Sequence, residues 1–383
     1  MSYLDHAATT PVRPEVLAAM LPYFTERFGN PSSSHPAGRA AALGVAEARR
    51  ILGALVDLPE TAVVFTAGGT EADVLALRGV LGALSGHRSL VISAVEHPAV
   101  LETAHALASE GVEVRVVGVD AFGRVDSSAV ADAVDESTAL VSIMHVNNET
   151  GAVQPIAELS RRAKARNPRV LVHVDAVQAF GRYPVSFANW PDVDLVSVAA
   201  HKIYGPKGAG ALFVRPGTSL APVITGGGQE AGLRSGTHNV PGIVGLAEAA
   251  RLLCATAEAD MARYAGLARR FLDGLAARVP GASLNGARDE QAPYALRAPY
   301  ILNVRFPGAT SEALLAALEA RGVIASAGSA CHAGETSLSP VLLAMGLDPS
   351  VGGAIVRFSF GRATTETDID AALEALAVLA GIG

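Results

Sequence analysis

One of the two cysteines stands in a run of small residues and could act as a nucleophile. Cys331 lies in SAGSACHAG (326–334), where Ser, Ala and Gly offer few side chains that could pack around a thiol. A structural cysteine usually behaves as a small buried hydrophobe, so this setting favours a chemical role. A free thiol has a pKa of about 8.5 and needs activation before it attacks. Cys254, in the helical apolar pattern AEAARLLCATAEA, is predicted to be a core residue.

Two charged residues end otherwise apolar runs. Lys202 follows DLVSVAAH, and Asp175 ends VLVHVD, with Gln178 within one turn of it. A lysine that leaves an apolar strand is a candidate Schiff-base amine, because desolvation lowers its pKa and frees the lone pair. A carboxylate there needs a partner, such as a protonated ring nitrogen. The structural alternatives are a Lys202 side chain that extends to solvent and an Asp175 that caps the following segment.

A glycine-rich turn precedes both of these residues. The run VVFTAGGTEADVLAL (63–77) passes from a strand pattern through glycines into a helix pattern. The amides of Gly69 and Thr70 are then free to bind an anion, assisted by the helix dipole. Neither the dinucleotide nor the Walker spacing is present, which favours the phosphate of a smaller cofactor. The alternative is a simple turn in which Thr70 caps the helix.

In combination these features indicate pyridoxal 5′-phosphate. A phosphate cradle, a strand-end Asp and a strand-end Lys, in that order on one sheet, are what this cofactor requires. Asp175 would keep the ring nitrogen protonated, which makes the ring an electron sink. Lys202 would carry the aldehyde until an amino acid displaces it.

Two further side chains could serve the same site. His97, in SAVEHPAV, could stack on the cofactor and exchange protons near neutral pH, or simply begin a helix before Pro98. Arg357, in GAIVRFSFGR, could hold a substrate carboxylate with its planar fork, or lie at a strand edge or surface.

Two polar loops are open to both functional and structural readings. Asn147, Asn148 and Glu149 follow a strand pattern and could orient a substrate or ring hydroxyl, or form an ordinary turn. The loop GGGQEAGLRSGTHN (226–239), which includes Thr237, could supply a second anion contact or a contact between subunits.

The elements that must position these residues form an α/β pattern. From residue 62, short β-branched runs alternate with Ala- and Leu-rich helical stretches, which is typical of a mainly parallel sheet. In such a sheet ligands bind beyond the carboxyl ends of the strands, where the candidate residues stand. Helices are predicted over 35–56, 71–84 and 240–279. After Pro280 a smaller set of strands and helices predicts a second, α+β domain.

Composition restricts the class of protein. The 383 residues suffice for two domains, and 50% hydrophobic with 17% charged residues excludes disorder. A net charge of −7 without a basic stripe favours neither nucleic acid nor an anionic membrane as partner. The chain has two cysteines, an N-terminal MSYLDHAATT without signal-peptide character, and no apolar run of about 18 residues. These features predict a cytoplasmic protein that does not span a membrane.

The chain resembles the NifS/IscS-type cysteine desulfurases of the class V aminotransferase group. The resemblance covers nearly the whole length and is carried, in order, by YLDHAATTPV, FGNPSSSH, FTAGGTEAD, EHPAV, VNNETGAVQPI, HVDAVQAFG, AHKIYGPKGAGAL, GGGQEAGLRSGT and SAGSACHAG. It implies an aspartate-aminotransferase-like α/β fold, fold type I of pyridoxal-phosphate enzymes. The large domain, 12–255, would hold a mainly parallel seven-stranded sheet. Residues 1–11 and 256–383 would form the small domain with the cysteine loop.

The resemblance also implies cofactor contacts. Lys202 would form the aldimine, Asp175 would pair with the pyridinium, and Gln178 would bond the ring hydroxyl. His97 would stack on the ring. The residues expected around the phosphate are Gly69, Thr70 and His201.

Further contacts concern the substrate and a second subunit. Thr237 would reach the phosphate of the neighbouring subunit's cofactor, which implies a homodimer. Asn148 and Arg357 would bind L-cysteine, with Asn148 also near the cofactor and Asn30 as an additional substrate contact. One departure is Ala199, where the family usually has a serine, so one phosphate hydrogen bond is expected to be missing.

By the same resemblance Cys331 would take up sulfur. Its thiolate would attack the sulfur of the bound cysteine, leaving a persulfide and releasing alanine. The persulfide would pass to an acceptor protein that serves iron–sulfur cluster assembly or tRNA thiolation.

The alternatives are a selenocysteine lyase, an aminotransferase or another lyase on the same scaffold, and a non-enzymatic sulfur-relay subunit. No metal site is expected, because His173, Asp175 and His201 lack metal-ligand spacing.

Overall fold

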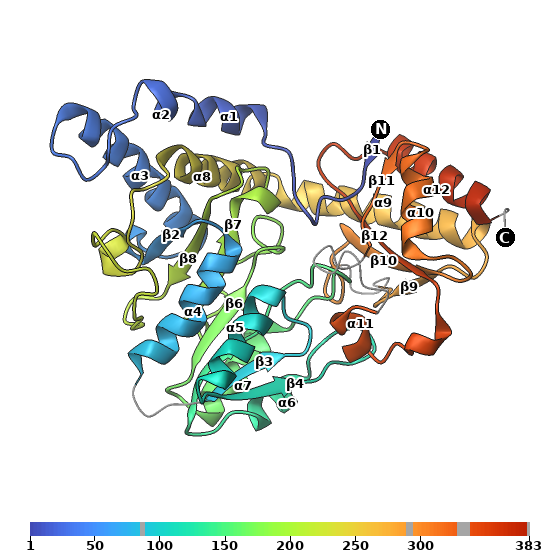
Figure 1. Cartoon of the computed structure of the whole chain (residues 1–383), viewed down its shortest axis with the longest axis horizontal. Coiled ribbons are helices and arrows are strands. Elements are labelled where there is room, and N and C mark those ends of the chain that lie inside the picture. Colours follow the sequence, from blue (N-terminus) through green and yellow to red (C-terminus); the bar gives the residue numbers. More distant parts are fainter. Residues whose placement is uncertain (85–88, 289–293, 328–337, 381–383) are drawn as a thin grey trace.

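A seven-stranded sheet forms the centre of the larger part of the chain (Figure 1). The structure is a computed structural model that describes residues 1–84, 89–288, 294–327 and 338–380. The strand order is β2-β8-β7-β6-β5-β3-β4, and β8 runs antiparallel to both of its neighbours while the other pairings are parallel. The predicted mainly parallel α/β sheet is therefore confirmed. Its strands are β2 Val63–Thr66, β3 Ser89–Ser93, β4 Glu113–Val117, β5 Thr138–Ser142, β6 Leu171–Asp175, β7 Leu195–Ala199 and β8 Gly210–Val214.

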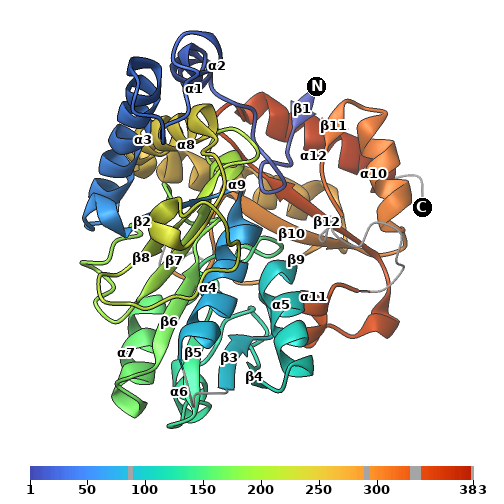
Figure 2. The same ribbon diagram turned by 60° about the vertical axis from the view of Figure 1, so that its left-hand side comes forward.

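Helices cover both faces of this sheet (Figures 1 and 2). Most of its strands are buried throughout, which is why they read as apolar runs rather than as alternating patterns. The predicted helix over 35–56 is α3, where Pro36 opens the helix and the ring of His35 accepts a hydrogen bond from the amide of Gly38. The helices of this part are α1 Pro14–Met20, α2 Pro22–Thr25, α3 Pro36–Leu55, α4 Gly69–Ala83, α5 Pro98–Ser109, α6 Ser127–Asp132, α7 Ile156–Arg166 and α8 Val240–Cys254.

A three-stranded antiparallel sheet, β12-β10-β9, follows later in the chain. The N-terminal strand β1 pairs with β11, so the first residues lie beside the last elements of the chain (Figure 1). The predicted boundaries at 11/12 and 255/256 stay a prediction. The elements are β1 Ser2–Tyr3, α9 Ala257–Arg278, β9 Ser283–Asn285, β10 Ile301–Phe306, α10 Ser311–Glu319, β11 Val323–Ile324, α11 Pro340–Ala344, β12 Ala354–Ser359 and α12 Glu366–Ala380. Short 3-10 helices are η1 Glu60–Ala62, η2 Ala200–Lys202, η3 Glu230–Gly232 and η5 Pro349–Val351.

The long apolar stretch after residue 240 forms helices, as predicted, and they are α8 and α9. In the described part of the chain, no single helix is long and apolar enough to cross a membrane. The pair α8 and α9 reaches that length and apolarity only together, and the two helices are bent by 70° at their junction. Helix α8 packs on α1 and α3, and α9 packs on α12.

Candidate active site

The amine of Lys202 and the amide of Gln178 meet at the N-terminal segment. Lys202 ends η2, directly after β7, and its Nζ donates hydrogen bonds to the carbonyl oxygens of Ala7 (2.6 Å) and Ala8 (2.8 Å). Gln178 Nε2 donates to the same Ala7 oxygen at 2.9 Å. The tertiary structure therefore brings Lys202 and Gln178 together at Ala7, which precedes them in the chain by 195 and 171 positions.

Asp175 is enclosed at the carboxyl end of β6. Its side chain accepts a hydrogen bond from the amide of Val177 at 2.9 Å, so the predicted alternative of a local backbone contact is also realised. Burial raises the pKa of Asp175, while His97, the Val177 amide and Lys202 oppose that rise. A buried carboxylate that faces two basic groups is suited to hold a cation.

His97 begins helix α5 and faces Asp175. Its Nδ1 accepts a hydrogen bond from the amide of Ala99 at 3.1 Å, which confirms the predicted helix-start role. Burial lowers the pKa of His97, and Asp175 partly offsets this. The neutral ring therefore carries its hydrogen on Nε2, the atom left for proton exchange.

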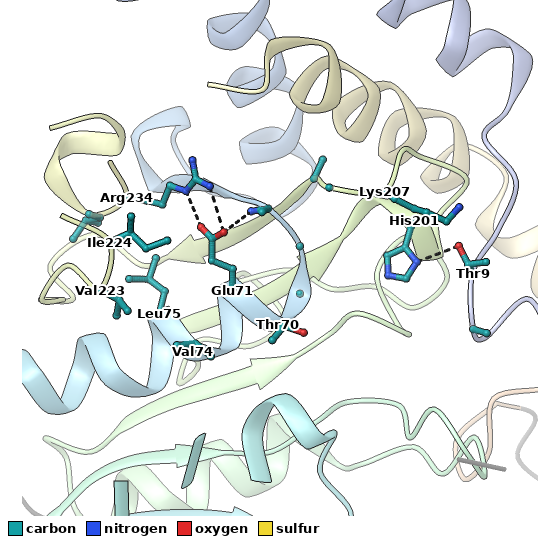
Figure 3. A pocket seen from close by; sticks show the side chains of 17 residues that line it. Thr9, Thr70, Glu71, Val74, Leu75, His201, Lys207, Val223, Ile224 and Arg234 are labelled. Carbon is teal, nitrogen blue, oxygen red and sulfur yellow. Dashed lines mark hydrogen bonds and ion pairs between the residues drawn. The ribbon is translucent and has the colours of Figure 1, made fainter. Parts of the chain in front are cut away.

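The glycine-rich turn after β2 opens into a cavity of about 680 Å³ (Figure 3). The N-cap of α4 is Gly68, and the helix begins at Gly69. Thr70 is therefore the second residue of the helix, and the alternative in which Thr70 caps it is wrong. A Cβ at Gly69 would lie 2.8 Å from Val177 Cγ2, so a larger residue would force the Val177 side chain or the turn to shift. The cavity is lined by Ala8, Thr9, Ala67, Gly68, Gly69, Thr70, Glu71, Val74, Leu75, His201, Lys207, Gly208, Ala209, Val223, Ile224, Leu233 and Arg234.

His201 lies on the other side of this cavity from Thr70 (Figure 3). Its Nδ1 is 3.2 Å from Thr9 Oγ1, and burial together with Lys202 and Lys207 lowers its pKa to about 4. A ring that is neutral at neutral pH can still donate the hydrogen bond of its one N–H to an anion. Ala199 is buried and contributes no side-chain donor, as the sequence predicted.

Arg357 is one of the largest fully buried side chains of the described residues, so the alternative of a surface arginine is wrong. Its guanidinium donates to Asp5 Oδ1 at 2.8 Å and to the carbonyl oxygen of Asn148 at 2.9 Å. Arg357 Nε has no hydrogen-bond partner within the described residues. The two predicted substrate contacts, Asn148 and Arg357, are therefore neighbours.

Thr237 and Asn30 do not join this group. They line a separate hollow of about 160 Å³, together with Tyr23, Phe28 and other residues. Within one chain, Thr237 is absent from the lining of the cavity that holds Gly69 and His201.

The two cysteines differ in what the structure describes. Cys331 lies outside the described residues. Cys254 is the last residue of α8 and is half-buried, so the prediction of a core residue is wrong. Burial raises the pKa of its thiol to about 11, consistent with the predicted unreactive role.

Comparison with known proteins identifies the family. Residues 2–372 match the family described as aminotransferase class-V. The chain belongs to the class-V aminotransferases.

Individual proteins are also similar to this chain. A relative from Trichormus azollae, named cysteine desulfurase, is 41% identical over 98% of this chain and 91% of its own length. A solved structure described as a NifS-like protein has a TM-score of 0.91 and 35% identity, covering 100% of this chain and 99% of its own. Another, described as SspA in complex with cysteine, has a TM-score of 0.80 and 32% identity, covering 94% and 99%.

Class-V aminotransferases depend on pyridoxal phosphate, and the residues present fit that group. The buried carboxylate of Asp175 matches a ring cation, and the amine of Lys202 is the nucleophile that an aldehyde needs. Gly69 and Thr70 are the first two residues of α4, so their backbone amides are open to a phosphate.

Sequence reasoning assigned no site role to the N-terminal segment and missed one ion pair. The segment entered only through the motif YLDHAATTPV, whereas the carbonyl groups of its Ala7 and Ala8 receive the Lys202 amine. Glu71 forms an ion pair with Arg234 at 2.7 Å and accepts from the amide of Ala67, so it fastens the 226–239 loop to the cradle (Figure 3).

Proposed function

We propose that this chain is a pyridoxal-phosphate-dependent cysteine desulfurase that converts L-cysteine to L-alanine. The observation that carries the proposal is the convergence of Lys202, Asp175 and His97, from three separate strand ends, beside a glycine cradle. Cysteine desulfurases about 40% identical over nearly the whole length support the same activity. When bound, the cofactor supplies an electron sink for the carbon atoms of the amino acid.

The residues of this chain would hold the cofactor from three sides. Lys202 would anchor the aldehyde end, after giving up its hydrogen bonds to Ala7 and Ala8. Asp175 would pair with the ring nitrogen, and the Gln178 amide would turn from Ala7 to the ring hydroxyl. The phosphate contacts would be Gly69, Thr70 and His201.

Substrate orientation would depend on Arg357 and Asn148. Asp5 and the Asn148 carbonyl hold two of the guanidinium nitrogens, which fixes the plane of the fork that would receive the substrate carboxylate. Asn30, the additional predicted substrate contact, lines the same hollow as Thr237 and would reach the substrate bound by a second copy. His97 would move protons at Nε2, because Nδ1 accepts the Ala99 amide.

Cys331 would take the sulfur. Its thiolate attacks the substrate sulfur, the substrate C–S bond breaks, and a new S–S bond forms on the enzyme. The carbon that loses sulfur gains a proton and leaves as alanine. The products, alanine and an enzyme persulfide, together contain the atoms of cysteine and the Cys331 thiol. An iron–sulfur scaffold or tRNA-thiolation protein of the cytoplasm would then accept the sulfur.

A homodimer would complete each site. Thr237 lies away from the cavity of its own chain, which supports a role at the phosphate bound by a second copy. Apolar side chains on α1, α2 and α3 and in the segments between them are exposed in the single chain and would be covered by that copy. They are Leu17, Leu21, Phe24, Phe28 and Leu43.

Mass spectrometry of the intact chain after incubation with L-cysteine tests the activity. We expect a borohydride-reducible cofactor adduct on Lys202 and added sulfur on Cys331. Cys331→Ala should keep the cysteine-dependent change in cofactor absorbance and lose the persulfide, with Cys254→Ala as the matched control that loses neither. Sulfur delivery by Cys331→Ala at the parent rate, or an adduct that persists in Lys202→Ala, would contradict the assignments.

Subunit complementation tests the dimer. Lys202→Ala and Thr237→Ala chains should each be impaired alone. When mixed and allowed to exchange, they form heterodimers with one intact site, and about a quarter of the parent activity should return. Failure of any activity to return would show that Thr237 serves its own subunit.

A further inference from the structure

A buried hydrogen-bond chain lies under the sheet end that carries Asp175. His173, fully buried on β6, has Nδ1 2.8 Å from Ser142 Oγ of β5 and Nε2 2.8 Å from Ser197 Oγ of β7. Ser197 stands opposite Asp175 in the pairing of β6 with β7. Asp73 of α4 lies beside this chain, with its Oδ1 3.6 Å from His173 Nε2.

Asp73 lacks the partners that an ionised carboxylate needs. Its side chain is 1% exposed, and its Oδ1 has no hydrogen-bond partner within the described residues. The titratable groups that face it are His173 and Asp175 from β6 and Glu96 from the segment after β3. None of the described lysines or arginines forms an ion pair with Asp73, and the His173 ring is 3.6 Å away and engaged with the two serines.

Asp175 is also buried, but it has the partners that Asp73 lacks. It accepts the Val177 amide and faces both Lys202 and His97. Two like charges at this depth repel each other strongly, so the pair retains one proton. That proton belongs on the carboxyl group that has no cationic neighbour, which is Asp73.

We propose that Asp73 is a positioning residue that stays a neutral carboxylic acid, so that the negative charge of the site rests on Asp175 alone. In this arrangement Ser197 Oγ donates to His173 Nε2, and His173 Nδ1–H donates to Ser142 Oγ, beside a neutral Asp73. No charge is then separated in the interior. An ionised Asp73 would oppose the charge of Asp175 and weaken its hold on a cation.

The direction of the pKa shifts agrees with this arrangement. Burial, followed by the charge of Asp175, raises the pKa of Asp73 well above its ordinary value. Burial lowers the pKa of His173 to about 3, so its ring is neutral. The role of Asp175 toward a pyridine ring rests on the proposed function, whereas the protonation of Asp73 does not.

The first test compares two Asp→Asn variants in the cofactor-free full chain at fixed protein concentration. Asn reproduces a neutral acid, so Asp73→Asn should be at least as stable as the parent at pH 5. Its unfolding equilibrium constant should then fall relative to that of the parent by up to tenfold per pH unit between pH 5 and pH 7. The sign follows because the folded parent retains a proton that its unfolded chain releases.

Asp194, the residue before β7, supplies the matched control. Its carboxylate pairs with Lys164 and accepts the Val172 amide, both at 2.8 Å. Asp194→Asn should destabilise the chain by a factor that does not grow over this pH range. If Asp73→Asn behaves like Asp194→Asn, Asp73 is ionised and the proposal is wrong.

Two further measurements do not depend on the unfolding equilibrium. The infrared carbonyl band of protonated carboxylic acids should lose intensity in Asp73→Asn at pH 7, and an unchanged band would overturn the proposal. In the cofactor-bound enzyme, the visible absorbance of the cofactor is followed as a function of pH. The proton concentration at the midpoint of the change should differ less than threefold between Asp73→Asn and the parent. A tenfold difference would show that the substitution removed a charge. If no such absorbance exists, the proposed function fails, and the other two measurements still decide the state of Asp73.

Discussion

Glu96 offers the sharpest test of how burial controls charge in this site. The side chain is 2% exposed and lies next to His97 in the chain. One carboxyl oxygen accepts hydrogen bonds from Ser93 Oγ and from the amide of Met144, the latter at 3.0 Å. The other oxygen has no partner within the described residues. Burial raises the pKa of Glu96 from 4.5 to about 8, so the folded protein holds it protonated at neutral pH.

The perturbation is Glu96→Gln, which replaces a neutral acid by a neutral amide of similar shape. An acid whose folded pKa is raised destabilises the fold increasingly as the pH rises from the unfolded pKa to the folded one. For Glu96, whose pKa is 4.5 in the unfolded chain and about 8 in the folded protein, the full destabilisation is roughly 5 kcal/mol, at about 1.4 kcal/mol per pKa unit. The variant lacks this dependence. Its free energy of unfolding should therefore exceed that of the parent by an amount that grows by about 3 to 4 kcal/mol from pH 5 to pH 8.

Urea denaturation of both proteins at several pH values, at one protein concentration, measures this difference. Glu71→Gln is the control, because the Glu71 carboxylate is partly exposed and ion-paired with Arg234. That variant should lose about 1 kcal/mol or less at every pH. A parent-to-Glu96→Gln difference that stays constant with pH, or a variant that becomes less stable than the parent at pH 8, would refute the protonated Glu96.

Three other substitutions probe the cradle and the substrate contact. Gly69→Ala should weaken cofactor binding at least tenfold in equilibrium dialysis, because its Cβ would lie 2.8 Å from Val177 Cγ2, and Val177→Ala in the same chain should restore most of it. Gly210→Ala should lower the free energy of unfolding in urea by about 1 to 3 kcal/mol, since the new Cβ would meet backbone atoms at 2.7 Å that cannot move aside alone. Asp5→Asn should raise the KM for L-cysteine several-fold without changing the cofactor's absorbance, because it removes the charge that orients Arg357; an unchanged KM would argue against that role.

Much of the site could be predicted because its chemistry stands at the ends of recognisable strands. Lys202 and Asp175 interrupt apolar runs that become β7 and β6, and burying a charge there has a cost that only a function or a partner offsets. Local pattern also predicted α3, α8 and α9 and the parallel sheet, since buried strands and amphipathic helices differ in composition and period. The family resemblance then gave expected roles to residues whose local context was ambiguous, such as Arg357.

The contacts that complete the site were decided by the tertiary structure alone. The carbonyl groups that receive the Lys202 amine come from Ala7 and Ala8, and the serines around His173 come from two other strands. Thr70 is no helix cap, and Thr237 lies outside the cavity of its own chain. Composition and spacing determine which residues can do chemistry and which segments become strands. Hydrogen-bond partners, burial depth and protonation depend on groups far apart in the chain, and only packing of the whole molecule brings those groups within a few ångströms of each other.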